Sequence, residues 1–281
     1  MKFILITVLS LILTNSVFAQ PQKDVMINQL KKIEINFHKA LQSFPNGVQF
    51  LKTVTHSDIQ VAFTHLENLN KFYSFQKPPK VEIVRTFVDF FLARLKLTLI
   101  YQKRSPLADE NFNPYVVAYK TALSEIAFYD PYHHRVIFHV DPLVTLSSKL
   151  QKYPEPKLDE YRVFFQALLL HEIGHAAQES LFGLVTKMLH AKTLTDQSDL
   201  DALIEGHTIH LQERHMQQIT NPPLWAVTAH QKLYDLSVLS GKTNEQLRKS
   251  LEIKKNCDQI LSNQNEKKVL EFILNKNDES N

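Results

Sequence analysis

The residues whose types and spacing most directly suggest chemistry are His171-Glu172-Ile173-Gly174-His175, which fit the pattern H-E-x-x-H. Histidines four positions apart lie on one face of a helix, so both imidazoles can reach a single metal ion. Glu172 lies about 100° further round such a helix, where it can address a water molecule held by that ion. The pattern therefore predicts metal-assisted hydrolysis. The alternative is a pair of hydrogen-bonded histidines in a helical core, because buried polar groups need partners.

A catalytic zinc site usually has three protein ligands and an open position, so a third ligand must come from elsewhere in the chain. We expect it to be Glu205, because Leu203 and Ile204 beside it indicate that this stretch borders the core. Gly206 follows and permits close approach of another backbone segment. The alternative for Glu205 is an exposed position or an ion pair with Arg214. The competing candidate ligands are Asp201, His207 and His210.

The motif belongs to a predicted helix that must be largely buried. Residues 164–170, which lead into it, are almost wholly apolar. Gly174 inside this helix costs about 1 kcal/mol relative to Ala, which suggests a steric reason for the missing side chain. We expect that a side chain at this position would crowd the metal or a neighbouring strand.

Two short apolar-rich runs lie upstream of the motif, at residues 125–129 and 135–140. The second run alternates with the period of a strand, so we expect a β-hairpin that closes at Asp141-Pro142. Elsewhere the apolar residues recur at helical spacing. Helices are predicted over residues 25–44, 48–75 and 81–101, and from 157 to about 275. The predicted fold class is mainly α with a small β-hairpin, an α+β arrangement.

The N-terminus predicts a secretory signal peptide. Lys2 gives a positive start, residues 3–13 are almost wholly apolar, and residues 17–19 offer a cleavage site after Ala19. The apolar run is too short for a membrane-spanning helix, which argues against a stable membrane anchor. We therefore expect an exported protein, periplasmic or secreted, in which residues 20–281 form a single, mostly helical domain.

The overall composition excludes several classes of protein. Charged residues make up 22% and hydrophobic residues 44% of the chain, which are globular proportions. The formal net charge of +3 gives no reason to expect a nucleic-acid partner. Cys257 is the only cysteine, so no internal disulfide can form, and packing or a metal must supply the stability. Nothing in the sequence sets the oligomeric state.

The region from 125 to 212 resembles a known family. Residues 169–178 look like the active-site helix of zincin metallopeptidases, and Glu205-Gly206 looks like the second helix of the gluzincin type. The resemblance implies one zinc ion per chain, with His171, His175 and Glu205 as ligands. It also implies that Glu172 is the general base.

The same resemblance implies an activity. The chain would be an exported zinc-dependent metallopeptidase that hydrolyses peptide bonds in an extended peptide or protein substrate. Zincins carry an edge strand upstream of the motif, so residues 135–140 are expected at a sheet edge beside the zinc. Thermolysin-like enzymes have an Asp four residues after the ligand Glu, and here Ile209 stands there. Asp201, one turn before Glu205, is the expected substitute.

The transition state of peptide hydrolysis needs a donor for its oxyanion besides the metal. His210, five residues after Glu205, is our first candidate for this catalytic role. The other candidates are His207, His215, His230 and Tyr234.

Two further function classes fit the same residues. The chain could be a zinc-dependent hydrolase of a non-peptide amide, such as a cell-wall crosslink. It could also be a non-catalytic binding protein with a zincin fold. The presence of Glu172 beside intact candidate ligands argues against the binding protein, because a general base contributes nothing to folding and would be lost first.

Overall fold

The computed structural model describes residues 21–279 apart from several internal stretches. The stretches left out are 70–74, 76, 109–111, 152–153, 219–243 and 264–265. The predicted signal peptide lies outside the described residues, and so do His230 and Tyr234, two of the candidate oxyanion donors.

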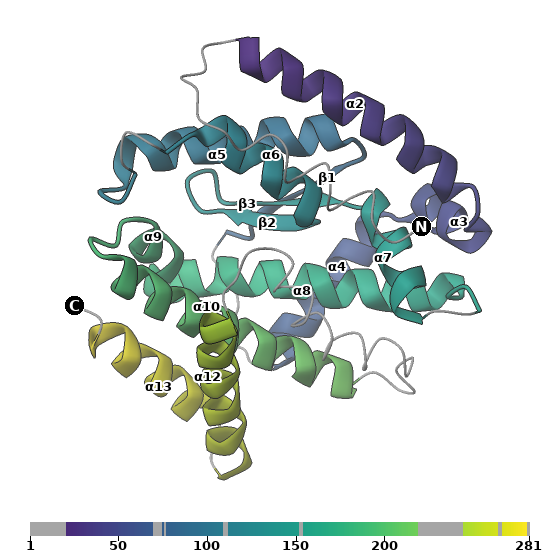
Figure 1. The fold of residues 1–281 in the computed structure, drawn as a ribbon. Helices are drawn as coiled ribbons and strands as arrows, with labels where there is room; N and C mark the ends of the chain where they lie inside the picture. The colour runs from purple at the N-terminus through teal and green to yellow at the C-terminus, as the bar shows by residue number, and fades with distance from the viewer. Residues whose placement is uncertain are drawn as a thin grey trace.

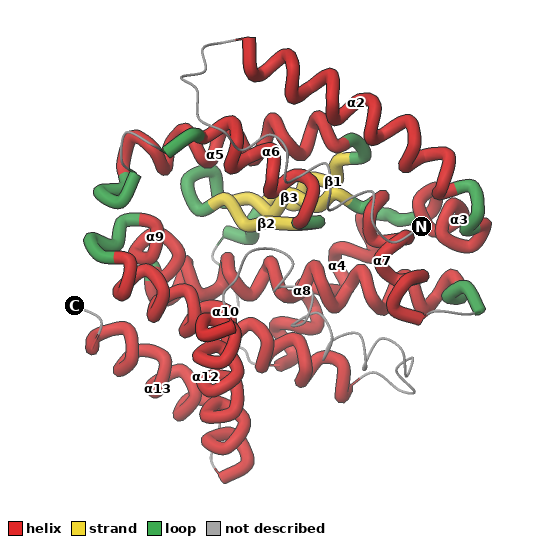
Figure 2. The backbone as a smooth tube through the Cα atoms, in the orientation of Figure 1, coloured by secondary structure: helices red, strands yellow, loops and turns green. Residues whose placement is uncertain are grey.

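The described chain is mainly helical, with one small sheet between helical layers (Figure 1 and Figure 2). The helices of the first half are α2 (Pro21–Leu41), α3 (Pro45–Thr53), α4 (His56–Leu69), α5 (Phe87–Arg104) and α6 (Pro114–Ser124). Those of the second half are α7 (Asp141–Gln151), α8 (Leu158–Phe182), α9 (Leu184–Leu189), α10 (Leu194–Gln218), α12 (Asn244–Asn263) and α13 (Glu266–Glu279). The strands are β1 (Lys80–Val84), β2 (Ala127–Asp130) and β3 (Arg135–His139). The predicted class, mainly α with a small β component, is confirmed.

The sheet has the strand order β1-β3-β2. Strands β2 and β3 form the predicted hairpin and pair antiparallel, with Phe128 opposite Ile137. Strand β1 pairs parallel with the other side of β3, with Val81 opposite Val136. The central strand is therefore β3, and β1 and β2 flank it.

The prediction that residues 135–140 form an edge strand is wrong, and the cause lies in residues 81–84. We expected these residues to begin a helix over 81–101. They form β1 instead, because Val81, Ile83 and Val84 are β-branched and suit a half-buried strand. The helix begins only at α5, where the Thr86 side chain accepts a hydrogen bond from the backbone N–H of Asp89. The extra strand covers the edge that β3 would otherwise present.

A second correction concerns Pro45, which lies in the break between the predicted helices over 25–44 and 48–75. Pro45 begins α3, at the first-turn position where a missing N–H costs no helical hydrogen bond. The predicted helix over 48–75 is accordingly two helices, α3 and α4.

The sheet lies between two hydrophobic clusters, and both β2 and β3 contribute buried side chains to each cluster. Figure 1 shows α5 and α6 on one side of the sheet, with α2 outside them, and α8 on the other side. Ile137 packs with Phe90 and Phe128 in the cluster against α5 and α6. Phe138 belongs to the larger cluster on the α8 side, where it contacts Phe165 edge-on at 4.9 Å between ring centroids.

Helix α8 is the central element of the larger cluster. It contacts β2 and β3 on one side and α4 and α10 on others, and α12 packs against the far side of α10. Its buried side chains, among them Phe165, Leu169 and Ile173, surround the helix and do not form a single stripe. A helix that is apolar nearly all round is a buried one. The buried polar residues of α8, His175 and Gln178, therefore need partners.

None of the helices within the described residues is both long enough and apolar enough to cross a membrane. Three polar residues of α8, His171, Glu172 and His175, form the candidate site.

Candidate metal centre

The two motif histidines lie one turn apart on α8, as the spacing predicts. Their rings meet edge-on, with centroids 4.7 Å apart and an interplanar angle of 90°. His171, Glu172 and His175 each offer one ligand atom, and these atoms lie within 4.8 Å of one another. Of the three, His171 and Glu172 are partly exposed, while His175 is buried. The group could hold a metal ion at a position that solvent can reach.

Glu205 reaches the same point from α10. Its carboxylate oxygens lie 3.5 Å from Nε2 of His171 and 3.8 Å from Nε2 of His175. Two ligand atoms, each 2.0–2.1 Å from a tetrahedral zinc ion, lie about 3.3 Å apart. The Oε2–His171 and Oε1–His175 separations are a few tenths of an ångström wider, so with a small inward movement the Glu205 carboxylate could share a zinc ion with either histidine. The donor set of two imidazoles and one carboxylate also suits zinc.

Glycines at two positions let α10 pack closely against its neighbours, Gly174 at the contact with α8 and Gly206 at the contact with α12. A Cβ at Gly174 would lie 2.9 Å from Cγ2 of Thr208 on α10. A Cβ at Gly206 would lie 2.4 Å from the backbone oxygen of Ser250 on α12. The steric reason expected for Gly174 is therefore present, although the crowded neighbour is a helix and not the metal or a strand.

Gln178, one turn after His175, fixes the orientation of that histidine. The Gln178 Oε1 atom lies 3.3 Å from Nδ1 of His175, and Nε2 donates to the backbone oxygen of Ile204 at 2.9 Å. The Gln178 Nε2 atom also lies 3.0 Å from Nδ1 of His207. Gln178 Oε1 accepts a hydrogen bond from His175 when Nδ1 of that ring carries the proton. The Nε2 atom of His175 then carries the lone pair, which faces Glu205 and could bind a metal ion. Sequence reasoning missed this role, whose only signal was an amide side chain three residues after a ligand.

Glu172 has the electrostatic character of a general base near neutral pH. Burial raises the pKa of Glu172 to about 7. The positive charge of a protonated His171 would oppose this rise, whereas the carboxylates of Glu205 and Glu125 add to it. A carboxylate whose pKa lies near the working pH is well matched to proton transfer.

A charged pair from the other helical layer stands on the same side of α8 as Glu172. Arg94 on α5 and Glu125, which follows α6, are 3.7 Å apart. The Arg94 guanidinium also lies 4.8 Å from the centroid of the Phe128 ring on β2. Arg94 lowers and Glu125 raises the pKa of Glu172, so both are electrostatically coupled to the motif. Neither residue was singled out from the sequence, because only the fold brings them to α8.

The candidate oxyanion donors that the structure describes make other contacts. His210 is buried, and its Nδ1 lies 2.6 Å from Oδ1 of Asp258 on α12. His207 is engaged by Gln178, and His215 packs against His65 on α4. The prediction that His210 stabilises an oxyanion gains no support from this position, which ties α10 to α12.

No protein-family model, curated protein or solved structure matches this chain. The case for a function therefore depends on the geometry of these side chains.

Proposed function

We propose that this protein is a zinc-dependent metallopeptidase of the zincin type, in which His171, His175 and Glu205 hold the ion. The observation that carries the proposal is the convergence of the Glu205 carboxylate on both histidines, from a separate helix and within 3.8 Å of each Nε2. Paired core histidines alone would not require a carboxylate at that point.

The chemistry divides between the ion and the chain. When bound, zinc would polarise the scissile carbonyl and lower the pKa of its bound water to about 7. Glu172 accepts the proton of the attacking water and later delivers it to the leaving amine. Gln178 keeps His175 in the tautomer that presents Nε2, and Glu205 neutralises charge at the centre.

The sheet supports recognition of an extended substrate, although through a different strand from the one we expected. Strand β2 lies at the edge of the sheet and contacts α8, whereas β3 is central. An edge strand offers backbone N–H and C=O groups to an incoming peptide. The proposed role in pairing with substrate therefore passes from β3 to β2. Export through the N-terminal signal would place this activity in the periplasm or outside the cell.

The test is a comparison of wild-type protein with Glu172→Gln on a mixture of unstructured peptides and non-peptide amides. Glu172→Gln should keep its zinc, because an isosteric amide at this position leaves all three ligands in place. Its activity should fall at least 10²-fold, the low end for losing a positioned general base. Glu252→Gln on the exposed face of α12 is the matched control and should keep full activity. Full activity of Glu172→Gln on a genuine substrate would exclude this mechanism, and cleavage confined to non-peptide amides would exclude a peptidase.

A further inference from the structure

A second pair of histidines lies where α4 and α10 pack together. His65 on α4 and His215 on α10 have ring centroids 4.4 Å apart, at an interplanar angle of 57°. The centroid separation is close to the 4.7 Å between His171 and His175. The two rings are therefore in contact, as neighbouring imidazoles that share an ion would be.

His215 is buried without a hydrogen bond. Its side chain has 0% exposure, and neither Nδ1 nor Nε2 has a partner among the described residues. A neutral imidazole carries one donor and one acceptor, and each one left unsatisfied in the interior costs about 1–3 kcal/mol. Such a group calls for an explanation, of which a bound ion is one.

Both rings are held in the form that binds metals. Burial lowers the pKa of His215 to about 4, and burial also lowers the pKa of His65. Both imidazoles are therefore neutral at pH 7, with lone pairs available for coordination. Protonation cannot supply the missing interactions of His215 at that pH.

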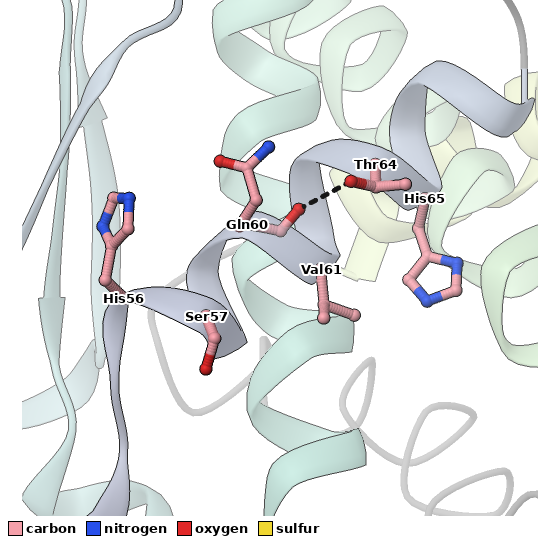
Figure 3. Close-up of a pocket in the computed structure, with 6 residues that line it drawn as sticks. All are labelled: His56, Ser57, Gln60, Val61, Thr64 and His65. Atoms are coloured by element: carbon pink, nitrogen blue, oxygen red, sulfur yellow. Dashed lines mark hydrogen bonds between the residues drawn. The ribbon is translucent and has the colours of Figure 1, made fainter.

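Solvent reaches His65 through a pocket on α4. The pocket has a volume of about 550 Å³ and is lined by His56, Ser57, Gln60, Val61, Thr64 and His65. Figure 3 shows His65 at one end of this pocket and His56 at the other. His65 therefore borders both open solvent and the buried ring of His215, so an ion could enter there and keep water ligands.

We propose that His65 and His215 form a second metal site, for a borderline transition-metal dication such as Zn²⁺. Imidazole nitrogens suit zinc, copper and nickel, whereas magnesium and calcium need oxygen ligands. Two neutral ligands bind a dication more weakly than two imidazoles with a carboxylate, so this site fills after the centre on α8. The inference does not depend on the proposed peptidase activity.

The experiment is a calorimetric titration of metal-free, full-length protein with Zn²⁺ alone. Wild type should show two classes of site, one tight and one weaker. His65→Phe keeps an aromatic ring but removes the ligand nitrogens, so it should lose the weaker class and keep the tight one. His175→Phe should do the reverse.

His56→Phe is the matched control. His56 lines the same pocket, but it lies roughly 13 Å from His65 along the axis of α4 and on the opposite face of that helix. This variant should keep both classes. His65→Gln, a polar substitution at a partly exposed position, provides a second variant if His65→Phe does not fold, and retention of the tight class shows that a variant is folded. A single class in wild type would overturn the proposal, as would a weaker class that survives in the folded His65 and His215 variants. An unchanged tight class in His175→Phe would instead contradict the proposed function and leave this site standing.

Discussion

The two histidine pairs differ in what surrounds them. His171 and His175 lie on one helix and face the carboxylate of Glu205, and His175 is oriented by Gln178. His65 and His215 come from two helices, and His215 makes no hydrogen bond within the described chain. The first pair therefore has its ligand geometry set by the protein before an ion arrives, while the second has only spacing and burial. We expect a carboxylate and an orienting amide to separate the proposed tight, catalytic centre from the proposed weak site.

The largest difference between the two pairs should appear when each loses one nitrogen ligand. His175→Phe should abolish both tight zinc binding and peptidase activity, and it should lower the melting temperature of the zinc-loaded protein. His215→Phe should leave activity intact and leave the metal-free protein at least as stable, because it replaces an unsatisfied buried imidazole with an apolar ring. Zinc content, activity and thermal melts of the two variants check this directly. Loss of activity in a folded, zinc-loaded His215→Phe would show that the pairs are not independent.

A pH titration sharpens the comparison at Glu172. The folded-state pKa of this carboxyl, about 7, lies above its ordinary value of 4.5, so the metal-free folded state holds a proton that the unfolded chain releases. Stability of the metal-free wild type should therefore fall, relative to Glu172→Gln, as pH rises from about 4.5 to about 7. The shift corresponds to a difference of up to about 3 kcal/mol above pH 7, and the difference should vanish near pH 4. Denaturant melts in the presence of a chelator measure this difference in stability, and curves that stay parallel across this window would contradict the raised pKa of Glu172.

Substitution of Gln178 tests whether its amide contributes to zinc affinity at the α8 centre. Gln178→Leu keeps a buried side chain of similar size but removes the hydrogen bond to His175. We expect zinc affinity at the α8 centre to fall about 10–100-fold, the usual effect of losing a partner that orients a metal ligand. Affinity at the His65–His215 pair should not change. Competition with a chromophoric chelator measures this zinc affinity. Equal zinc affinity in wild type and Gln178→Leu would show that the amide does not contribute.

The smallest expected effect concerns the spacing of α8 and α10. Gly174→Ala places a Cβ 2.9 Å from Cγ2 of Thr208, so the helices must separate slightly. Crowding a packed interior typically costs about 1–3 kcal/mol, offset by up to about 1 kcal/mol from replacing glycine in a helix. Thr208→Ser removes the crowded methyl group and should restore the free energy of unfolding in the double variant. Strictly additive effects of the two substitutions would show that this contact is not the cause.

The arrangement of the motif residues on α8 could be predicted from the sequence, because this information is local. The four-residue spacing of His171 and His175 sets their common face, and the apolar residues before them indicate burial. Glu205 was accessible through the apolar residues beside it. The hairpin was also found, because its alternation and its turn lie within a few residues.

Other features could not be found because they depend on contacts far apart in the chain. Strand β1 was mistaken for the start of α5, because the pairing with β3 that fixes it joins residues far apart in the chain, and this error put β3 at the sheet edge. The partner of His210, Asp258, lies 48 residues away, so no local pattern indicates the contact between His210 and α12. His65 and His215 are brought together only by the packing of α4 against α10.

The central claim is that Glu205 completes the zinc centre, and the most direct measurement is the zinc content of Glu205→Gln. Each variant is stripped of metal, given one equivalent of Zn²⁺ and dialysed against a mild competing chelator that empties weak sites. Wild type and Glu172→Gln should retain about one zinc per chain. Glu205→Gln should retain far less, because a neutral amide is a poorer ligand than a carboxylate. Full retention by Glu205→Gln together with loss of zinc from Asp201→Asn would contradict the account and transfer the third ligand to Asp201.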